Sequence, residues 1–221
     1  MTLQAPPRVD RRLLLIAVLM PIGPGCVALL RYLLPYFTAS DSAQTVAAAA
    51  AAPGRQSTVL WLGYLAALTL VPGVLAAARV TRAASPRLTD AALCLLVPAY
   101  LSMPVLLSGD HLLLAGPEAG VDAATTARLF DTMHPSLLVG IGVFVLGHVV
   151  GTVLLGVALL RSQRTPAAAA WALTISQPLH FVAAVIVGSP ALDLLAWSLT
   201  AVGMGFAAAA LIRMQDAPES A

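Results

Sequence analysis

Four polar residues cluster inside an apolar run near the end of the chain. The stretch ISQPLHFVAAVIVG places Ser176, Gln177 and His180 within five positions, shortly after Thr174. Residues three and four apart are neighbours on a helix, so these side chains share one broad face. Imidazole, amide and hydroxyl groups on one face could bind a small ligand, pass protons or act as acid and base.

A second histidine lies in an earlier apolar run. His148 is four positions before Thr152, so this pair also shares a helix face. Imidazole and amide groups that face lipid leave hydrogen bonds unmade, at a cost of several kcal/mol. We therefore predict that both polar faces turn into a helix bundle and form a pocket open to the outside, between the fourth and fifth spans. Its predicted ligand contacts are His148, Thr152, Thr174, Ser176, Gln177 and His180.

The composition requires a membrane to position these residues. Of the 221 residues, 59% are hydrophobic and 10% are charged, and the mean hydropathy is +0.89. A soluble domain would carry about 25% charged residues, so the excess apolar surface must face lipid. Runs of about twenty apolar residues predict an all-α bundle of six transmembrane helices. The predicted single domain covers residues 1–221, with spans at about 13–34, 59–78, 88–107, 135–160, 166–187 and 191–212.

The arginines predict the orientation of this bundle. Arg31, Arg55 and Arg128 lie toward one side of the membrane, and the other nine of the twelve basic residues lie toward the opposite side: Arg8, Arg11, Arg12, Arg79, Arg82, Arg87, Arg161, Arg164 and Arg213. Because positively charged connections stay inside, we predict a bacterial cytoplasmic (inner) membrane protein with both termini in the cytoplasm. The outer segments 39–57 and 122–132 are predicted to form short surface helices. The residues then expected outside are Asp41, Asp110, Glu118, Asp122 and Asp131.

Other residues of the spans are expected to serve packing and anchoring. Gly147 and Gly151 form a G-x-x-x-G pattern, which favours close approach by another helix. That helix is expected to be the fifth span, or a second copy of the chain in a helix–helix oligomer. Arg31 is expected to extend its guanidinium group to the outer membrane surface. Asp193, near a span end, is expected to cap its helix or to lie among lipid headgroups.

Metal and haem sites are alternatives. His134 and His148 are fourteen positions apart, a spacing that resembles ligand pairs in dihaem membrane cytochromes, but His180 falls between the two levels. At 1.5 Å per residue, His180 is roughly 11 Å and His148 roughly 20 Å below the outer surface, so one haem b between them would have to absorb an offset of roughly 9 Å. Zinc could use His111, His134 and Asp131, which have suitable ligand types but no tight metal motif.

Three classes of function stay open. In the first, the pocket binds a small or lipid-like ligand for transport or sensing. In the second, the same histidines and Asp131 act as general acid and base on a lipid or isoprenoid, so the sequence leaves enzyme activity undecided. In the third, the polar groups only hold helices together, and the protein is a non-catalytic scaffold subunit. The net charge of +2 gives no argument for nucleic-acid binding.

Three stretches resemble a known type of protein. GHVVGTVLLGVALLRS and WALTISQPLHFVAAVIVGSPALDLLAW, together with LRYLLPYFTASD near the start, look like small six-span membrane proteins of high-GC bacteria. This likeness covers most of the chain and implies a single six-span domain. That group has no known activity to carry over, so the resemblance implies no site residue.

Overall fold

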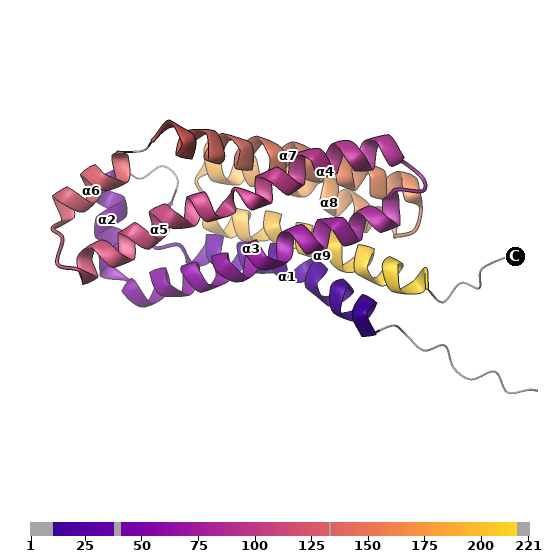
Figure 1. Cartoon of the computed structure of the whole chain (residues 1–221), viewed down its shortest axis with the longest axis horizontal. Coiled ribbons are helices and arrows are strands. Elements are labelled where there is room, and N and C mark those ends of the chain that lie inside the picture. Colours follow the sequence, from indigo (N-terminus) through magenta and orange to yellow (C-terminus); the bar gives the residue numbers. More distant parts are fainter. Residues whose placement is uncertain (1–10, 38–40, 133, 216–221) are drawn as a thin grey trace, which may run out of the picture.

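The computed structural model describes residues 11–37, 41–132 and 134–215, and these residues fold into helices without strands (Figure 1). Six segments are long and apolar enough to cross a membrane. The all-α, six-span prediction is confirmed. The spans are α1 (Arg11–Leu33), α3 (Pro53–Thr81), α4 with α5 (Pro86–Leu101 and Met103–Glu118), α7 (Pro135–Ser162), α8 with the π-helix η1 (Ala167–Phe181 and Val182–Val187) and α9 (Pro190–Arg213).

The third span is broken and is longer than predicted. Its two helices, α4 and α5, meet at Ser102. Pro104 lies in the first turn of α5, where the missing N–H removes no intrahelical hydrogen bond. The prediction that the third span ends near residue 107, before Asp110, was wrong, because the helix continues to Glu118. The apolar residues 111–115 that follow Asp110, apart from one histidine, give the helix no reason to end there.

Two short helices cover one end of the bundle, as predicted. They are α2 (Ser42–Ala51) and α6 (Ala123–Asp131), and we call them the cap (Figure 1). Asp41 and Asp122 accept a backbone hydrogen bond at the start of these helices, which is the usual role of an N-cap carboxylate. The Ser42 hydroxyl of α2 donates to Asp131 of α6 at 2.7 Å. A small apolar core joins the cap to α5: Val46, Ala49, Leu113 and Phe130.

Close helix packing occurs at glycines, but with a different neighbour than expected. A Cβ atom on Gly147 would lie 2.7 Å from the Leu95 carbonyl oxygen, so this face contacts α4 of the third span. The prediction that the fifth span packs against Gly147 and Gly151 was wrong. The fifth span, α8, approaches α7 at Gly156, next to Thr174. An oligomer through Gly147 and Gly151 stays a prediction, and it would require α4 to move away.

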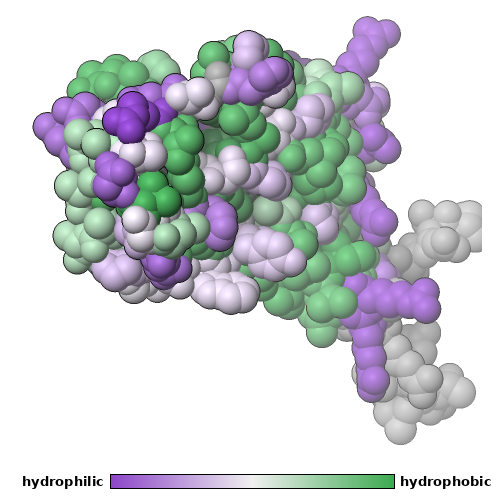
Figure 2. Space-filling model, turned by 60° about the vertical axis from the view of Figure 1, so that its left-hand side comes forward, coloured by the Kyte–Doolittle hydropathy of each residue, from purple (hydrophilic) through white to green (hydrophobic). Residues whose placement is uncertain are grey.

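The surface of the bundle suits a membrane. Figure 2 shows hydrophobic side chains over the middle of the molecule and hydrophilic side chains gathered at the end nearest the chain termini. Large apolar residues such as Trp61, Leu138 and Ile186 are exposed on the sides of the helices. Because helices satisfy their own backbone hydrogen bonds, such a belt can contact acyl chains directly. The chain is a multi-pass membrane protein.

Candidate functional site

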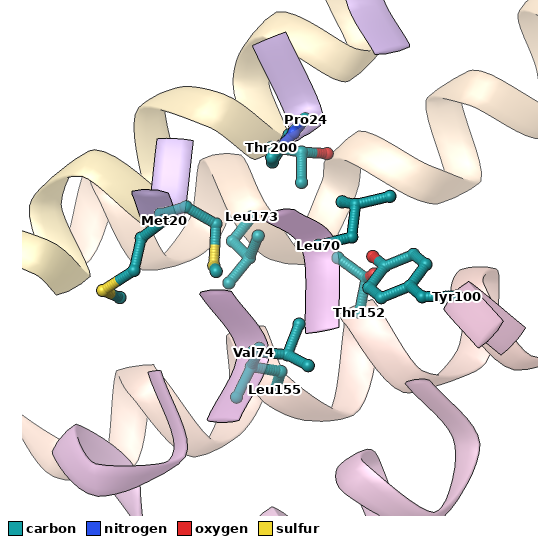
Figure 3. Close-up of a pocket in the computed structure, with 10 residues that line it drawn as sticks. Met20, Pro24, Leu70, Val74, Tyr100, Thr152, Leu155, Leu173 and Thr200 are labelled. Atoms are coloured by element: carbon teal, nitrogen blue, oxygen red, sulfur yellow. The ribbon is translucent and has the colours of Figure 1, made fainter. Parts of the chain in front are cut away.

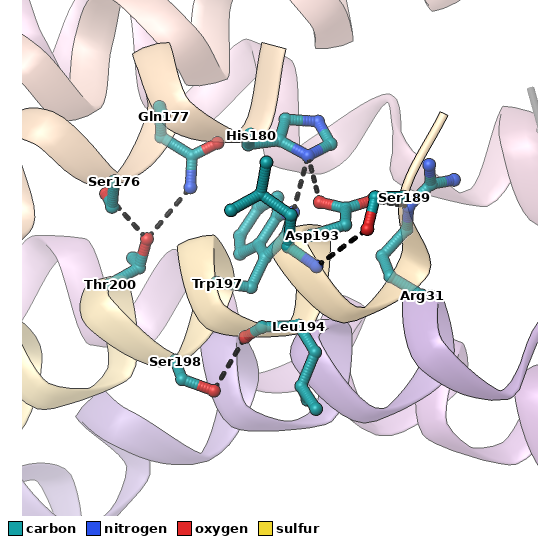
Figure 4. Close-up of polar contacts among 11 residues, drawn as sticks. Arg31, Ser176, Gln177, His180, Ser189, Asp193, Leu194, Trp197, Ser198 and Thr200 are labelled. Carbon is teal, nitrogen blue, oxygen red and sulfur yellow. Dashed lines mark hydrogen bonds and ion pairs between the residues drawn. The ribbon is translucent and has the colours of Figure 1, made fainter. Parts of the chain in front are cut away.

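Three helices converge on one buried carboxylate, that of Asp193 in the first turn of α9 (Figure 4). Arg31, near the end of α1, donates from Nε to Asp193 Oδ2 at 2.6 Å. Nδ1 of His180 on α8 lies 2.5 Å from Asp193 Oδ1. Trp197, one turn further along α9, places its indole nitrogen 3.2 Å from the same His180 nitrogen. The carboxylate therefore joins α1, α8 and α9 in the half of the bundle near the cap.

This cluster overturns two expectations. Asp193 does not cap α9, because Ser189 does so by accepting the Leu192 backbone N–H. Arg31 does not extend to the membrane surface, because its side chain is mostly buried and bonded to Asp193. The charge-assisted hydrogen bond to the buried Asp193 carboxylate explains the inward turn. The Arg31 guanidinium also lies 5.0 Å above the centre of the Phe37 ring.

His148 of α7 lies beside His180, inside the bundle. The two ring centres are 5.4 Å apart, and the His148 ring stacks on Phe144 at 4.6 Å and on Trp197 at 5.6 Å. His148 Nδ1 is 2.6 Å from the Phe144 carbonyl oxygen. A carbonyl can only accept, so Nδ1 carries the proton. His148 Nε2 is buried and has no hydrogen-bond partner among the described residues. The two histidines meet although the depth calculation separated them.

A cavity of about 530 Å³ adjoins these rings, between the bundle and the cap. Its walls come from α1, α5, α6, α7, α8, η1 and α9, and most of the lining side chains are apolar. The volume falls within the range of roughly 300–1,000 Å³ that is typical of small-molecule sites. The polar and aromatic-polar lining residues are Arg31, Tyr36, Ser108, Asp110, Thr132, His148, His180 and Trp197.

A second polar group lies in the cavity wall on the side of the cap. The Tyr36 hydroxyl donates to Asp110 Oδ1. The Gln56 amide donates to the backbone carbonyl of Asp110 at 3.0 Å and to its Oδ1 at 3.2 Å. Burial and the neighbouring Asp110 carboxylate raise the pKa of Tyr36, so the phenol keeps its proton and acts as the donor. These bonds tie the segment after α1 to α3 and α5.

At the boundary between α7 and η1, side chains that line the cavity also reach the outer surface of the protein. Helix α7 packs along α8, whereas the neighbours of η1 are α8 and α9. Val145 on one side and Phe181 and Val185 on the other line the cavity, yet these residues are 38%, 45% and 61% exposed. We call this boundary the seam. Because its exposed residues are apolar and belong to membrane-spanning segments, the seam faces lipid rather than water.

Ser176 and Gln177, which precede the seam residues in the same span, contact α9 and do not line the cavity (Figure 4). The Gln177 amide donates to the Thr200 hydroxyl oxygen, and the Thr200 hydroxyl donates to Ser176, both at 2.8 Å. Ser176 in turn donates to the Leu173 carbonyl at 2.8 Å. This chain of hydrogen bonds fixes α8 to α9, and it explains why Ser176 and Gln177 do not line the cavity.

The two predicted threonines also lie away from the large cavity. The Thr174 hydroxyl donates at 2.8 Å to a carbonyl one turn earlier in its own helix. Thr152 lines a separate void of about 10 Å³ in the core, where Tyr100 and Thr200 are the other polar lining residues (Figure 3). A void of this size has room for about one water molecule. It is too small for an organic ligand.

The candidate metal ligands do not come together. His134 caps the start of α7, Asp131 bonds to α2, and His111 is exposed on α5. Within the part of the chain that the structure describes, no group of three or more His, Cys, Asp or Glu residues is placed to hold a metal ion. The ring centres of His148 and His180 are 5.4 Å apart, and Nδ1 of each ring lies within hydrogen-bond distance of another residue of the protein.

Of the six predicted ligand contacts, the structure places His148 and His180 in the wall of the large cavity. Sequence reasoning missed Asp193 and Arg31 as parts of the same cluster. A signal for this pair was present, because an ionisable residue inside an apolar span requires a buried partner. Arg31 lies in the last turn of α1 and Asp193 in the first turn of α9, so the two opposite charges lie toward the same side of the membrane.

No protein family, curated protein or solved structure matches this chain. The geometry of the cavity and its polar cluster therefore has to support any functional conclusion.

Proposed function

We propose that this membrane protein binds a lipid-like ligand in the cavity beneath the cap, and that the ligand arrives from the bilayer through the seam. One observation carries the proposal: Val145, Phe181 and Val185 both line the cavity and face lipid. An apolar molecule could pass between the bilayer and the cavity without crossing water. With the predicted orientation, in which the cap lies outside, the ligand would come from the outer leaflet.

The cavity has the two kinds of surface that an amphiphile needs. Its apolar wall suits an acyl or isoprenoid chain, because burial of apolar surface drives binding. At the polar end, His180 and His148 are the proposed contacts for a head group, with Arg31 and Asp110 nearby. Such binding would serve transport of the ligand or sensing of its concentration.

Two observations favour binding over a purely structural role. A scaffold subunit needs no internal cavity, and empty space lowers stability in proportion to its volume. The G-x-x-x-G face, which a partner protein could have used, contacts α4 of the same chain. Both features are easier to explain when the cavity has an occupant.

The seam can be tested by blocking it. Val145→Trp places a large side chain at the seam, and Leu146→Trp is the matched control, because Leu146 is 69% exposed and is not part of the cavity wall. In vesicles that contain a photoreactive lipid, labelling of cavity residues should fall several-fold in Val145→Trp and stay unchanged in Leu146→Trp. Equal labelling in both variants, or no labelling of cavity residues in the unmodified protein, would contradict the proposal.

A specific pair of residues supports a second candidate, a membrane-embedded enzyme. A carboxylate bonded to imidazole Nδ1 orients the ring and stabilises its protonated form, as in general-base catalysis, and Asp193 and His180 have this arrangement. The substrate would be a lipid or isoprenoid in the same cavity. Mass spectrometry of reconstituted vesicles should then show a lipid product that is lost in Asp193→Asn. Unchanged lipids over time would exclude this candidate for the lipids supplied.

A further inference from the structure

We infer that the head group of the ligand is a hydrogen-bond donor, a hydroxyl or ammonium group, rather than a carboxylate or phosphate. This inference rests on the proposed function, because it concerns the same cavity. It follows from the hydrogen positions that the neighbours of His148 and His180 require.

The proton of His180 is set by its contact with Asp193. One ring nitrogen cannot donate to a carboxylate and accept from an indole N–H at the same time. Nδ1 of His180 is 2.5 Å from Asp193 and 3.2 Å from the indole nitrogen of Trp197, so the carboxylate is the closer partner. Arg31, at 2.6 Å from Asp193, favours the ionised carboxylate. Nδ1 of His180 therefore carries the proton and donates it to Asp193.

With Nδ1 protonated, a neutral His180 can only accept at Nε2. Figure 4 shows the opposite edge of the ring turned away from Asp193. This nitrogen makes no hydrogen bond to the described residues, and the side chain is 14% exposed in the cavity wall. His148 has the same pattern, because its Nδ1 donates to Phe144 and its Nε2 has no partner within the described chain. Nε2 of His180 is therefore the acceptor that the polar end presents to an incoming head group, whereas Nε2 of His148 is buried.

The charges around these nitrogens also disfavour an anion. Arg31 from α1 and Asp193 from α9 are paired at the polar end, so the guanidinium charge is balanced there. Asp110 from α5 lines the same cavity, and its Oδ1 already accepts from Tyr36 and Gln56. A carboxylate or phosphate head would meet the acceptor nitrogen of His180 and a guanidinium that already has a carboxylate partner. A hydroxyl or ammonium head would instead donate to His180 and recover a hydrogen bond that is otherwise missing.

A competition series on the unmodified protein tests the inference. The full chain, in phosphatidylcholine nanodiscs, is labelled with 1-tetradecanol carrying a photoreactive diazirine. Unlabelled 1-tetradecanol, tetradecylamine, myristate and tetradecane compete at pH 8, which is above the usual titration range of imidazole. One additional hydrogen bond predicts that the alcohol or the amine competes about tenfold more strongly than myristate and tetradecane. The ratio of alcohol to amine tells which donor is preferred.

The possible failures are distinguishable. Equal competition by all four compounds would show that the head group is not recognised, and stronger competition by myristate would show an anion site. Either result overturns the donor-head inference while leaving lipid binding in place. No labelling of cavity residues would overturn the proposed function itself.

A pair of variants assigns the effect to His180. His180→Phe keeps an aromatic ring beside Trp197 and removes the acceptor nitrogen, whereas His111→Phe changes an exposed histidine outside the cavity wall. The preference for the donor heads over tetradecane should disappear in His180→Phe and persist in His111→Phe. A preference that survives in folded His180→Phe overturns the inference. If that variant does not fold, the series on the unmodified protein decides alone.

Discussion

The ion pair between Arg31 and Asp193 has an exposed counterpart of the same length, Arg82 with Asp90. The N–O distance is 2.6 Å in both pairs. Their surroundings differ, because the side chains of the first pair are 20% and 0% exposed and those of the second 59% and 57% exposed. Replacing each residue by Leu, singly and together within its pair, gives a coupling energy for each pair. Burial is the main difference between the two pairs, so it is the main source of any difference between the two coupling energies.

Coulomb's law sets the scale of the expected difference. Unit charges about 4 Å apart attract by about 4 kcal/mol at the effective dielectric constant of about 20 found in proteins, and by about 1 kcal/mol in water. The helices stay inserted when a membrane protein unfolds in micelles, which reduces measured couplings. We therefore expect a coupling of about 2–4 kcal/mol for Arg31 with Asp193, and below about 1 kcal/mol for Arg82 with Asp90. Asp193→Leu alone should lower stability by about 3–5 kcal/mol, because it leaves a mostly buried guanidinium without its carboxylate.

Unfolding by sodium dodecyl sulfate in mixed micelles, followed by tryptophan fluorescence, measures these free energies for all six variants. A coupling between Arg31 and Asp193 no larger than that of the exposed pair would refute the reasoning. It would mean either that the buried carboxylate is compensated by other groups, His180 first, or that water reaches the cluster.

Two further predictions concern packing and the cap. Gly147→Ala should lower the free energy of unfolding by about 1–3 kcal/mol, because the new Cβ would lie 2.7 Å from the Leu95 carbonyl oxygen. The control is Gly142→Ala, whose Cβ would have no described atom within 4 Å and which should be neutral in the same unfolding assay. Hydrogen bonds from the Thr125 hydroxyl and backbone lower the pKa of Asp122, so its carboxylate stabilises α6 above the ordinary value of 3.8, and this stabilisation is lost as the pH falls through the lowered pKa. Hydrogen exchange of α6, corrected for intrinsic rates, is compared at one pH above 3.8 and at one pH below the lowered pKa of Asp122. The helix should open more at the lower pH, and Asp122→Asn should remove the difference. Equal protection at both pH values would count against this role.

Part of the site followed from local rules alone. Apolar runs of spanning length determined the six spans, because a helix of that length satisfies all of its own backbone hydrogen bonds in lipid. Helical spacing and the cost of polar groups in lipid determined that His148 and His180 turn inward. The N-cap residues Asp41 and Asp122 determined where the cap helices begin. Each of these results depends on neighbours within about one turn of the chain, or on the solvent, and both can be read from a sequence.

Only the tertiary structure decided which helix meets each polar face. Ser176 and Gln177 bond to α9 rather than to α7, and Arg31 reaches a carboxylate 162 positions away. The seam likewise exists because η1 packs on α8 and α9 while α7 follows α8. Periodicity determines the direction in which a side chain points, but a partner on another helix depends on how all six helices pack at once. That packing is set by glycine contacts and buried charges whose partners are distant in the chain.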